Sequence, residues 1–312
     1  MARLGRTDLD VHPLCLGGNV FGWTADEETS FAVLDAYASA GGNFVDTADA
    51  YSAWVPGHDG GESETVIGRW MAARGNRDRM VIATKVGRLT GKADLHADTI
   101  RAAARDSLRR LQTDYIDLYY AHGDDNPEIP LDETLGAFDE LVRDGKARYI
   151  AASNYSVERL AEALEISKRD GLAPYVALQP HYNLVEREYE DGLRTLCADE
   201  GLPCLPYFSL AMGFLTGKYR PGGPEVDSPR SEGASKYLDE RGLAVLEALG
   251  EIAAAHGTSL AAVALAWLRA QPTVAAPIAS ARTPEQLAEL LPMAELELQQ
   301  AELDRLTGAG RS

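Results

Sequence analysis

The stretch Met80-Val81-Ile82-Ala83-Thr84-Lys85 decides the fold class, because it is a short β-branched apolar run that ends on a charged side chain. An amphipathic pattern follows it over Ala97–Leu111 and indicates a helix. The same order recurs along the chain, which is typical of a parallel sheet. The expected strands are Pro13–Gly17, Asn43–Asp46, Met80–Lys85, Tyr115–His122, Arg148–Ser153, Tyr175–Gln179, Leu202–Tyr207 and Thr273–Ser280. The expected helices are Glu27–Ala40, Glu62–Arg74, Ala97–Leu111, Leu131–Arg143, Ser156–Arg169, Glu186–Glu200 and a longer region from Lys236 to Ala270.

Eight strands that alternate with helices predict a (β/α)₈ TIM barrel, an α/β fold. We expect a single barrel domain over residues 1–312 with a short N-terminal β-hairpin. An open doubly wound sheet is the alternative. It loses support at Leu16-Gly17-Gly18-Asn19-Val20-Phe21-Gly22, where Asn19 replaces the middle glycine of the nucleotide-binding fingerprint and no helix begins at once.

Composition excludes several classes of function. The 312 residues are 45% hydrophobic and carry a formal net charge of −18, which argues against a nucleic-acid or acidic-membrane partner. No apolar run approaches the length of a membrane span, and no secretory signal is evident, so we expect a cytoplasmic protein. The three cysteines, Cys15, Cys197 and Cys204, are expected to be reduced core residues.

Reactive side chains stand where expected strands end. Asp46, Lys85 and His122 each close such a strand, and Tyr51 follows Asp46 by five residues. All strand ends of a barrel open onto one face, so these four side chains are expected to share a site. A phenol has a pKa of about 10, and Lys85 is expected to lower that of Tyr51 by roughly 2, which suits a proton donor.

Two questions stay open at this site. Asp46 could keep Lys85 charged and oriented, or the two could form only a structural ion pair. His122 could hydrogen-bond a substrate oxygen or relay a proton. The other histidines lack metal-binding spacing, and we expect no metal; they are His12, His58, His96, His181 and His256.

Several separated motifs resemble the aldo-keto reductase superfamily, including its branch of potassium-channel β subunits. The resemblance covers nearly the whole chain, and its motifs are Arg3-Leu4-Gly5-Arg6-Thr7, Asn43-Phe44-Val45-Asp46-Thr47-Ala48, Ala50-Tyr51, Gly145-Lys146-Ala147-Arg148-Tyr149-Ile150, Ser153-Asn154-Tyr155-Ser156 and Gly213-Phe214-Leu215-Thr216-Gly217-Lys218-Tyr219. It implies hydride transfer from a nicotinamide to an aldehyde or ketone, with Asp46, Tyr51, Lys85 and His122 as the catalytic tetrad. The implied cofactor is NADPH, with NADH as the other option.

The resemblance also implies the cofactor contacts. Ser153, Asn154 and Gln179 match positions that hold the carboxamide, and Tyr207 matches the residue that stacks on the nicotinamide. The remaining implied contacts are Gly18, Asn19, Asp46 and Ser280, then Ser209, Leu210, Gly213 and Lys218 along the pyrophosphate, and Arg282, Gln286 and Glu289 near the adenosine and its 2′-phosphate. The chain departs from the common pattern at Phe208, Ser280 and Leu290, which bears on the choice between NADPH and NADH.

The sequence indicates fewer residues for the substrate pocket than for the cofactor site. Trp23 and Trp54 follow the first two expected strands and could line an apolar pocket beside Tyr51 and His122. The segment Arg220–Gly233 is expected to be a mobile loop that could close over a ligand. We expect a small carbonyl substrate and leave the oligomeric state open. A cofactor-binding regulatory subunit, similar to the channel β subunits, is the alternative function.

Overall fold

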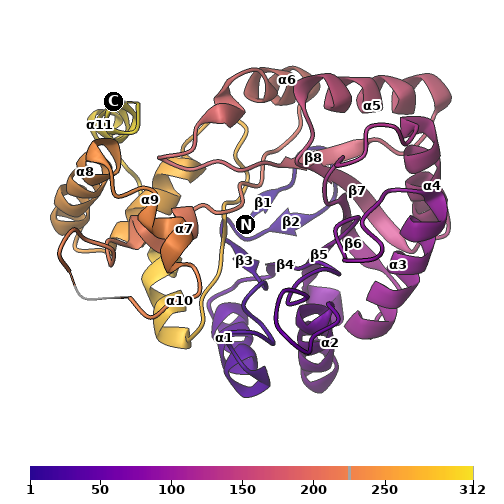
Figure 1. Cartoon of the computed structure of the whole chain (residues 1–312), viewed down its shortest axis with the longest axis horizontal. Coiled ribbons are helices and arrows are strands. Elements are labelled where there is room, and N and C mark those ends of the chain that lie inside the picture. The colour runs from indigo at the N-terminus through magenta and orange to yellow at the C-terminus, as the bar shows by residue number, and fades with distance from the viewer. Residues whose placement is uncertain (224–225, 312) are drawn as a thin grey trace.

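A curled parallel sheet with helices around its outer face dominates the molecule (Figure 1). The computed structural model describes residues 1–223 and 226–311. The seven strands are hydrogen-bonded in the order β8-β7-β6-β5-β4-β3-β9. Their bounds are β3 Cys15–Gly17, β4 Phe44–Asp46, β5 Val81–Val86, β6 Ile116–Ala121, β7 Ala147–Ser153, β8 Tyr175–Gln179 and β9 Ile278–Ala279.

Helices follow most of the strands and confirm the α/β class. The α-helices are α1 Glu27–Ser39, α2 Glu62–Arg74, α3 Ala97–Leu111, α4 Leu131–Arg143, α5 Val157–Asp170, α6 Leu193–Glu200, α7 Ser231–Ser235, α8 Glu240–His256, α9 Leu260–Arg269, α10 Pro284–Leu290 and α11 Gln300–Ala309. Short 3₁₀ helices are η1 Arg77–Arg79, η2 Glu188–Glu190, η3 Ala211–Thr216 and η4 Leu291–Ala294.

The strand expected over Leu202–Tyr207 is not present as a strand. Cys204 makes isolated parallel bridges to Leu178 on one side and Val274 on the other. Pro203 and Pro206 lack the amide hydrogens that a continuous ladder requires, so pairing is confined to single residues. Pro277 shortens the expected strand Thr273–Ser280 to β9 in the same way.

Two expected helices are each divided. Over Glu186–Glu200, Gly192 adopts a φ of 100° between η2 and α6, a conformation that a continuous helix cannot contain. The long region from Lys236 to Ala270 breaks at Gly257, whose φ is 62°, and Ser259 then caps α9 through the amide of Ala262. The axes of α8 and α9 differ by 98°.

Alternation along the strands divides the core into two apolar layers. One layer packs between the sheet and the helices, and the other fills the interior of the curled sheet. In β6, Tyr119 belongs to the outer layer while Leu118 and Tyr120 belong to the inner one. At the N-terminus, β1 Ala2–Arg3 pairs antiparallel with β2 Asp10–Val11, and Leu4 and Leu9 join the inner layer.

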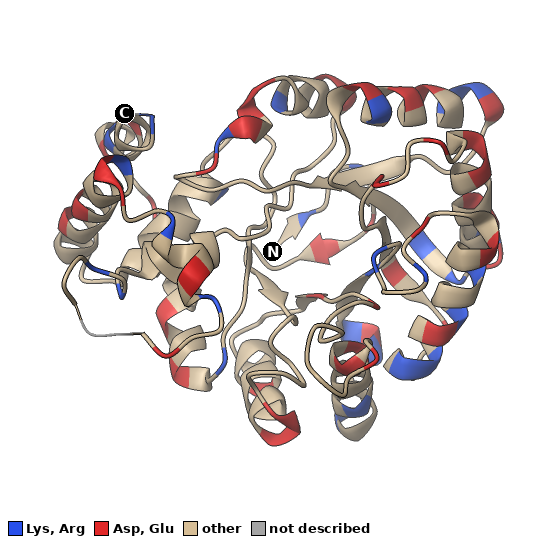
Figure 2. Ribbon diagram, viewed as in Figure 1, with Lys and Arg blue, Asp and Glu red and all other residues tan. Residues whose placement is uncertain are grey.

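Charge lies mainly on the outer helices. Asp and Glu residues are spread over these helices, whereas Lys and Arg gather beside α3 (Figure 2). Within residues 1–223 and 226–311, no single helix is long and apolar enough to cross a membrane, although the bent pair α8 and α9 meets that test by length and composition together.

The expected loop Arg220–Gly233 is only partly irregular. Residues 224–225 lie outside the described residues. The last three positions, Ser231–Gly233, belong to helix α7 rather than to a loop. Just before α7, the side chain of Arg230 is folded against the rings of Trp23 and Phe208, 5.9 Å from each ring centroid.

Candidate active site

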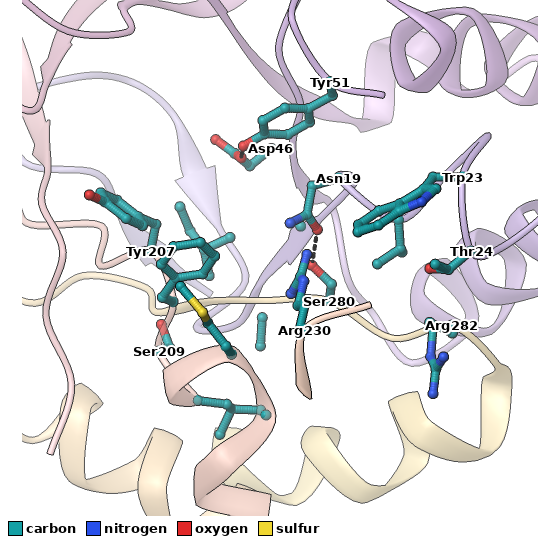
Figure 3. Close-up of a pocket in the computed structure, with 18 of the residues that line it drawn as sticks. Asn19, Trp23, Thr24, Asp46, Tyr51, Tyr207, Ser209, Arg230, Ser280 and Arg282 are labelled. Carbon is teal, nitrogen blue, oxygen red and sulfur yellow. Dashed lines mark hydrogen bonds between the residues drawn. The ribbon is translucent and has the colours of Figure 1, made fainter. Parts of the chain in front are cut away.

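A cavity of about 740 Å³ opens at the carboxyl ends of the strands (Figure 3). Nearly every expected site residue lines it. Those residues are Asn19, Trp23, Asp46, Tyr51, Trp54, His122, Ser153, Asn154, Gln179, Tyr207, Ser209, Leu210, Gly213, Lys218, Ser280, Arg282, Gln286 and Glu289. Two expected residues, Gly18 and Lys85, are not in the lining. The topology of the sheet therefore gathers positions that lie far apart in sequence.

A buried ion pair anchors the tetrad. Lys85 of β5 donates from Nζ to Oδ2 of Asp46 at 2.7 Å, to the carbonyl of Thr47 at 2.7 Å and to the Tyr51 hydroxyl at 2.9 Å. These three bonds use all three protons of the ammonium group. Burial lowers the pKa of Lys85, and the Asp46 carboxylate opposes that shift. Lys85 is fully buried beneath the cavity wall, where it can act on a ligand through Tyr51.

The Tyr51 hydroxyl lies between cation and anion. It accepts the bond from Lys85 and donates to Oδ2 of Asp46 at 3.1 Å. Burial and the negative charge of Asp46 raise the pKa of Tyr51 well above its ordinary value. The lowering expected from Lys85 was wrong, because burial and the carboxylate bonded to the same hydroxyl both favour the protonated phenol. Tyr51 therefore stays protonated at neutral pH.

His122 lies just beyond β6, with its ring centroid 6.1 Å from that of Tyr51. Burial, and then the charges of Lys85 and Arg88, lower its pKa well below the ordinary value. The imidazole is therefore neutral at pH 7. Its Nδ1 is buried without a hydrogen-bond partner in the described part of the chain, which leaves Nε2 as the nitrogen available to the cavity.

Three amide and hydroxyl side chains form one wall at the ends of β7 and β8. Ser153 donates to the carbonyl oxygen of Gln179 at 2.9 Å. Asn154 donates to the carbonyl of His122 at 2.8 Å and accepts from the Tyr207 hydroxyl at 2.8 Å. Gln179 donates to Oδ1 of Asp46 at 2.9 Å. This wall therefore reaches the tetrad directly through Gln179.

Tyr207 presents a ring to the cavity. One of its faces stacks on His181, with centroids 5.2 Å apart and planes 16° from parallel. His181 does not line the cavity, so the ring face turned away from it is the one that can receive a planar ligand. The neighbouring Phe208 has a φ of 49°, and Asn154 has one of 56°, left-handed conformations that are uncommon outside glycine. Such backbone strain clusters at binding sites.

Asn19 and Ser280 form a contact that explains two departures from sequence patterns. The Ser280 hydroxyl donates to Oδ1 of Asn19 at 2.5 Å (Figure 3). A Cβ on Gly17 would lie 2.6 Å from that same hydroxyl oxygen, so a larger residue there would displace the hydroxyl from Asn19. Gly18 lies behind this contact, where its amide donates to the carbonyl of Asp46 at 2.7 Å and joins the first turn to β4.

Three cationic side chains line the cavity, and one of them, Arg230, lies against Trp23 and close enough to Tyr51 for their charges to interact. The three are Lys218, Arg230 and Arg282, and none of them forms an ion pair with a carboxylate within residues 1–223 and 226–311. Burial lowers the pKa of Arg230, and the neighbouring charge of Arg282 acts in the same direction. Uncompensated cations in one cavity of a protein with a net charge of −18 indicate a site for an anion.

Aromatic side chains form the rim of the cavity beside Tyr51. The Trp23 and Trp54 rings meet edge to face with centroids 5.3 Å apart, and Trp54 lies 6.2 Å from the Tyr51 ring. Trp54 remains 51% exposed. Arg88 also lines this part of the wall, and Asp125 holds its guanidinium through two bonds of 2.7 Å.

Sequence reasoning missed Arg88 and Arg230 as lining residues. Arg88 follows Lys85 by three positions, and its place after the same strand was the available signal. Arg230 lies in the segment Arg220–Gly233 that was expected to close over a ligand, but the sequence did not single out its side chain, because that depends on how the segment before α7 folds. Phe208 and Leu290, noted only as departures, also line the cavity.

Comparison with known proteins decides the family. The family model described as "Aldo/keto reductase family" matches residues 13–311. The chain belongs to the aldo/keto reductase family. This aldo/keto reductase is 36% identical over 306 residues to the uncharacterized oxidoreductase YrpG of Bacillus subtilis, covering 95% of this chain and 91% of that protein.

Two further relatives span the same region. Protein tas of Escherichia coli is 33% identical over 322 residues, covering 95% of this chain and 93% of tas. Norsolorinic acid reductase B of Dothistroma septosporum is 31% identical over 317 residues, covering 96% of this chain and 78% of the reductase. Membership of this family and these relatives support oxidoreductase activity for this aldo/keto reductase.

Proposed function

We propose that this aldo/keto reductase reduces an aldehyde or ketone to an alcohol with NADPH, and that Tyr51 is the general acid. One observation carries the proposal: the Tyr51 hydroxyl lies at the cavity wall, bonded to both Lys85 and Asp46, beside a neutral His122. A general acid needs a proton at neutral pH and a group that stabilises its conjugate base. Tyr51 has both.

The cavity fits a nicotinamide dinucleotide. Its amide wall, with Gln179 Oε1 free of partners in the described chain, suits a carboxamide, and the cavity face of Tyr207 suits a planar ring. Lys218, Arg230 and Arg282 suit phosphates. When bound, the reduced nicotinamide supplies the hydride that attacks the carbonyl carbon.

Proton delivery is the task of the tetrad. The O–H bond of Tyr51 breaks as the carbonyl oxygen accepts its proton, and the phenolate remains 2.9 Å from Lys85 Nζ. At that distance the attraction between unit charges is on the order of 6 kcal/mol at an effective dielectric constant of about 20. Asp46 keeps Lys85 charged, so Lys85 can stabilise the phenolate at the moment it forms.

His122 orients the carbonyl in this proposal. Because its pKa lies well below the ordinary value, the ring is neutral and carries one N–H donor. A neutral ring can hydrogen-bond the carbonyl oxygen, but it has no extra proton to deliver at neutral pH. This favours the hydrogen-bond role over a proton relay.

NADPH is preferred over NADH in this proposal because of the far end of the cavity. Arg282 has no carboxylate partner in the described chain and lies beside Gln286 and Glu289 in the lining. A guanidinium group binds phosphate oxygens in a bidentate manner, and only NADPH carries a 2′-phosphate.

The substrate end suits an aromatic or otherwise bulky apolar carbonyl compound. Trp23, Trp54 and Tyr51 form a continuous aromatic edge beside His122. The relative named norsolorinic acid reductase B is a reductase by its name, which agrees with the direction proposed here. The aromatic edge would hold the apolar body of the substrate against the tetrad.

We further propose that the sheet closes into the eight-stranded barrel of this family. Cys204 bridges Leu178 and Val274, so the segment from 202 to 207 occupies the position of the strand that the seven-stranded sheet lacks.

The test of the proposed function is NADPH oxidation at 340 nm with a panel of aliphatic and aromatic carbonyl compounds. Consumption of NADPH that depends on the carbonyl is expected, and its absence with every compound would contradict the proposal.

A further inference from the structure

One hydrogen bond crosses the interior of the sheet at the cavity. Gln179, the last residue of β8, donates from Nε2 to Oδ1 of Asp46, the last residue of β4, at 2.9 Å. Strands β7, β6 and β5 separate β8 from β4 in the sheet order. Each side chain is only 2% exposed, so solvent competes little for this bond.

Gln179 completes the set of donors around Asp46. Oδ2 of Asp46 accepts from Lys85 and Tyr51, and Oδ1 accepts from Gln179. Without the amide, Oδ1 would be a buried carboxylate oxygen with no side-chain donor in the described chain. A buried charge lacking a donor draws more strongly on its remaining partners. Gln179 therefore influences how strongly Asp46 holds the Tyr51 proton.

The orientation of the amide is dictated by chemistry. An ionised carboxylate only accepts hydrogen bonds, so the Gln179 atom that faces Asp46 must be nitrogen. Gln179 also lines the cavity, and Oε1 has no partner within residues 1–223 and 226–311. One side chain thus meets the tetrad with its donor and leaves its acceptor for a ligand.

We propose that Gln179 is a positioning residue for the proton donor. Its Nε2 fixes the Asp46 carboxylate, and Asp46 in turn orients Lys85 and the Tyr51 hydroxyl. Its Oε1 remains for the cofactor carboxamide, so cofactor binding and the acidity of Tyr51 are linked through one amide. This inference rests on the proposed function and adds a role that cofactor binding alone does not require.

Two further titratable groups that face this bond stay neutral, Cys15 of β3 and Tyr120 of β6. Asp49 and Arg230 act on Lys85 and Tyr51 from outside it. Burial, followed by the Asp46 charge, raises the pKa of the Cys15 thiol and of the Tyr120 hydroxyl well above their ordinary values. Burial also raises the pKa of Asp49, whose charge acts on Lys85, to about 7, so the parent itself has a titration near neutral pH. Only a titration that appears in the variant and is absent from the parent is assigned to the introduced group.

The test is the variant Gln179→Glu, which keeps the size and the acceptor but loses the donor unless it is protonated. Two carboxylates about 3 Å apart cannot both ionise easily, so the introduced carboxyl has a raised pKa. The ratio of the variant's kcat to the parent's is measured with saturating NADPH and carbonyl compound. This ratio should fall at least tenfold between pH 6 and pH 8.5, because a second negative charge beside Asp46 weakens Tyr51 as an acid.

Ser153→Ala is the matched control. Ser153 belongs to the same amide wall but makes no contact with Asp46. It is expected to raise the Kd of NADPH without a new titration in kcat. If Gln179→Glu also raises only the Kd and leaves the pH profile of kcat parallel to the parent, Gln179 is a cofactor ligand alone and the inference is wrong.

A second readout does not depend on activity. In ligand-free protein, the introduced carboxyl keeps its proton to higher pH when folded than when unfolded. The Tm of Gln179→Glu should therefore fall relative to the parent as pH rises from about 4.3 through the raised pKa. Adding Asp46→Asn, whose amide can donate to the introduced carboxylate, should abolish most of that difference. A Tm difference that persists unchanged with Asp46→Asn would show that residue 179 does not interact with Asp46 as proposed. A parent enzyme that reduces no carbonyl compound would instead contradict the proposed function. The Tm series would still test whether residue 179 interacts with Asp46.

Discussion

The ammonium group of Lys85 donates a hydrogen bond of 2.9 Å to the hydroxyl oxygen of Tyr51. The two residues are 34 positions apart and meet because β4 and β5 are neighbours in the sheet. Lys85 itself is fully buried and does not line the cavity. It can therefore act on a bound ligand only indirectly, through its bonds to Tyr51 and Asp46 and through the effect of its charge on His122.

Removal of the Lys85 charge should affect both stability and turnover. In Lys85→Met, Asp46 would remain as a buried carboxylate without its cation, which costs about 3–5 kcal/mol in the free energy of unfolding. The Tyr51 phenolate would also lose its stabilising charge, so kcat should fall at least 100-fold. Urea denaturation and steady-state kinetics measure the two effects. Lys92→Met, at an exposed lysine, is the control. Parent-like turnover in Lys85→Met would contradict the role given to Lys85.

The neutral state of His122 predicts a pH dependence of stability. Burial, Lys85 and Arg88 lower its pKa in the folded protein. As pH falls through about 6.5, the unfolded chain therefore binds a proton at His122 that the folded chain does not bind. The contribution of His122 is thus fully present above pH 6.5 and is lost as pH falls below it. The free energy of unfolding should decrease more between pH 7.5 and 5 in the parent than in His122→Asn. Equal decreases would show that His122 is not held neutral.

Arg282 should determine the preference between the two nicotinamide cofactors. A hydrogen bond to a charged group contributes about 1.5–3 kcal/mol, so Arg282→Gln is expected to raise the Kd of NADPH roughly 10–100-fold. The Kd of NADH, which has no 2′-phosphate, should change less than about threefold. Titration of cofactor fluorescence measures both constants. An equal rise for both cofactors would place Arg282 elsewhere than at the 2′-phosphate.

Much of this site could be predicted from sequence because strand ends converge in a parallel sheet. Asp46, Lys85 and His122 follow apolar runs, and topology alone brings them to one face. The direction of the Tyr51 pKa shift could not be predicted, because it depends first on how deeply the hydroxyl is buried and then on its contact with Asp46. The contact of Gln179 with Asp46, across three intervening strands, had no local signal either.

The errors in the fold have local chemical causes. The prolines at 203 and 206 looked compatible with an apolar strand, yet they remove the hydrogen-bond donors that a strand needs. Helix breaks at Gly192 and Gly257 are visible in sequence only as glycines, which helices also tolerate. Arg230 reaches the cavity through tertiary folding of the segment before α7, which periodicity does not encode.

Trp54 should select for bulky substrates without stabilising the fold. Its side chain is 51% exposed, so Trp54→Ala is expected to change the free energy of unfolding by less than about 0.5 kcal/mol. An aromatic contact contributes about 0.5–1.5 kcal/mol, so kcat/KM for a two-ring aromatic ketone should fall about fivefold. The value for a small aliphatic aldehyde should stay within about twofold. Parallel losses for both substrates would remove Trp54 from the substrate contact.

Tyr51→Phe tests the central claim most directly. The substitution removes only the hydroxyl that bonds Lys85 and Asp46 and keeps the ring packed against Trp54. General acid catalysis contributes about 100- to 10,000-fold, so kcat for NADPH-dependent carbonyl reduction should fall within that range. The Kd of NADPH, measured by fluorescence, should stay within about threefold of the parent. Turnover equal to that of the parent, with cofactor binding intact, would contradict the assignment of Tyr51 as the proton donor.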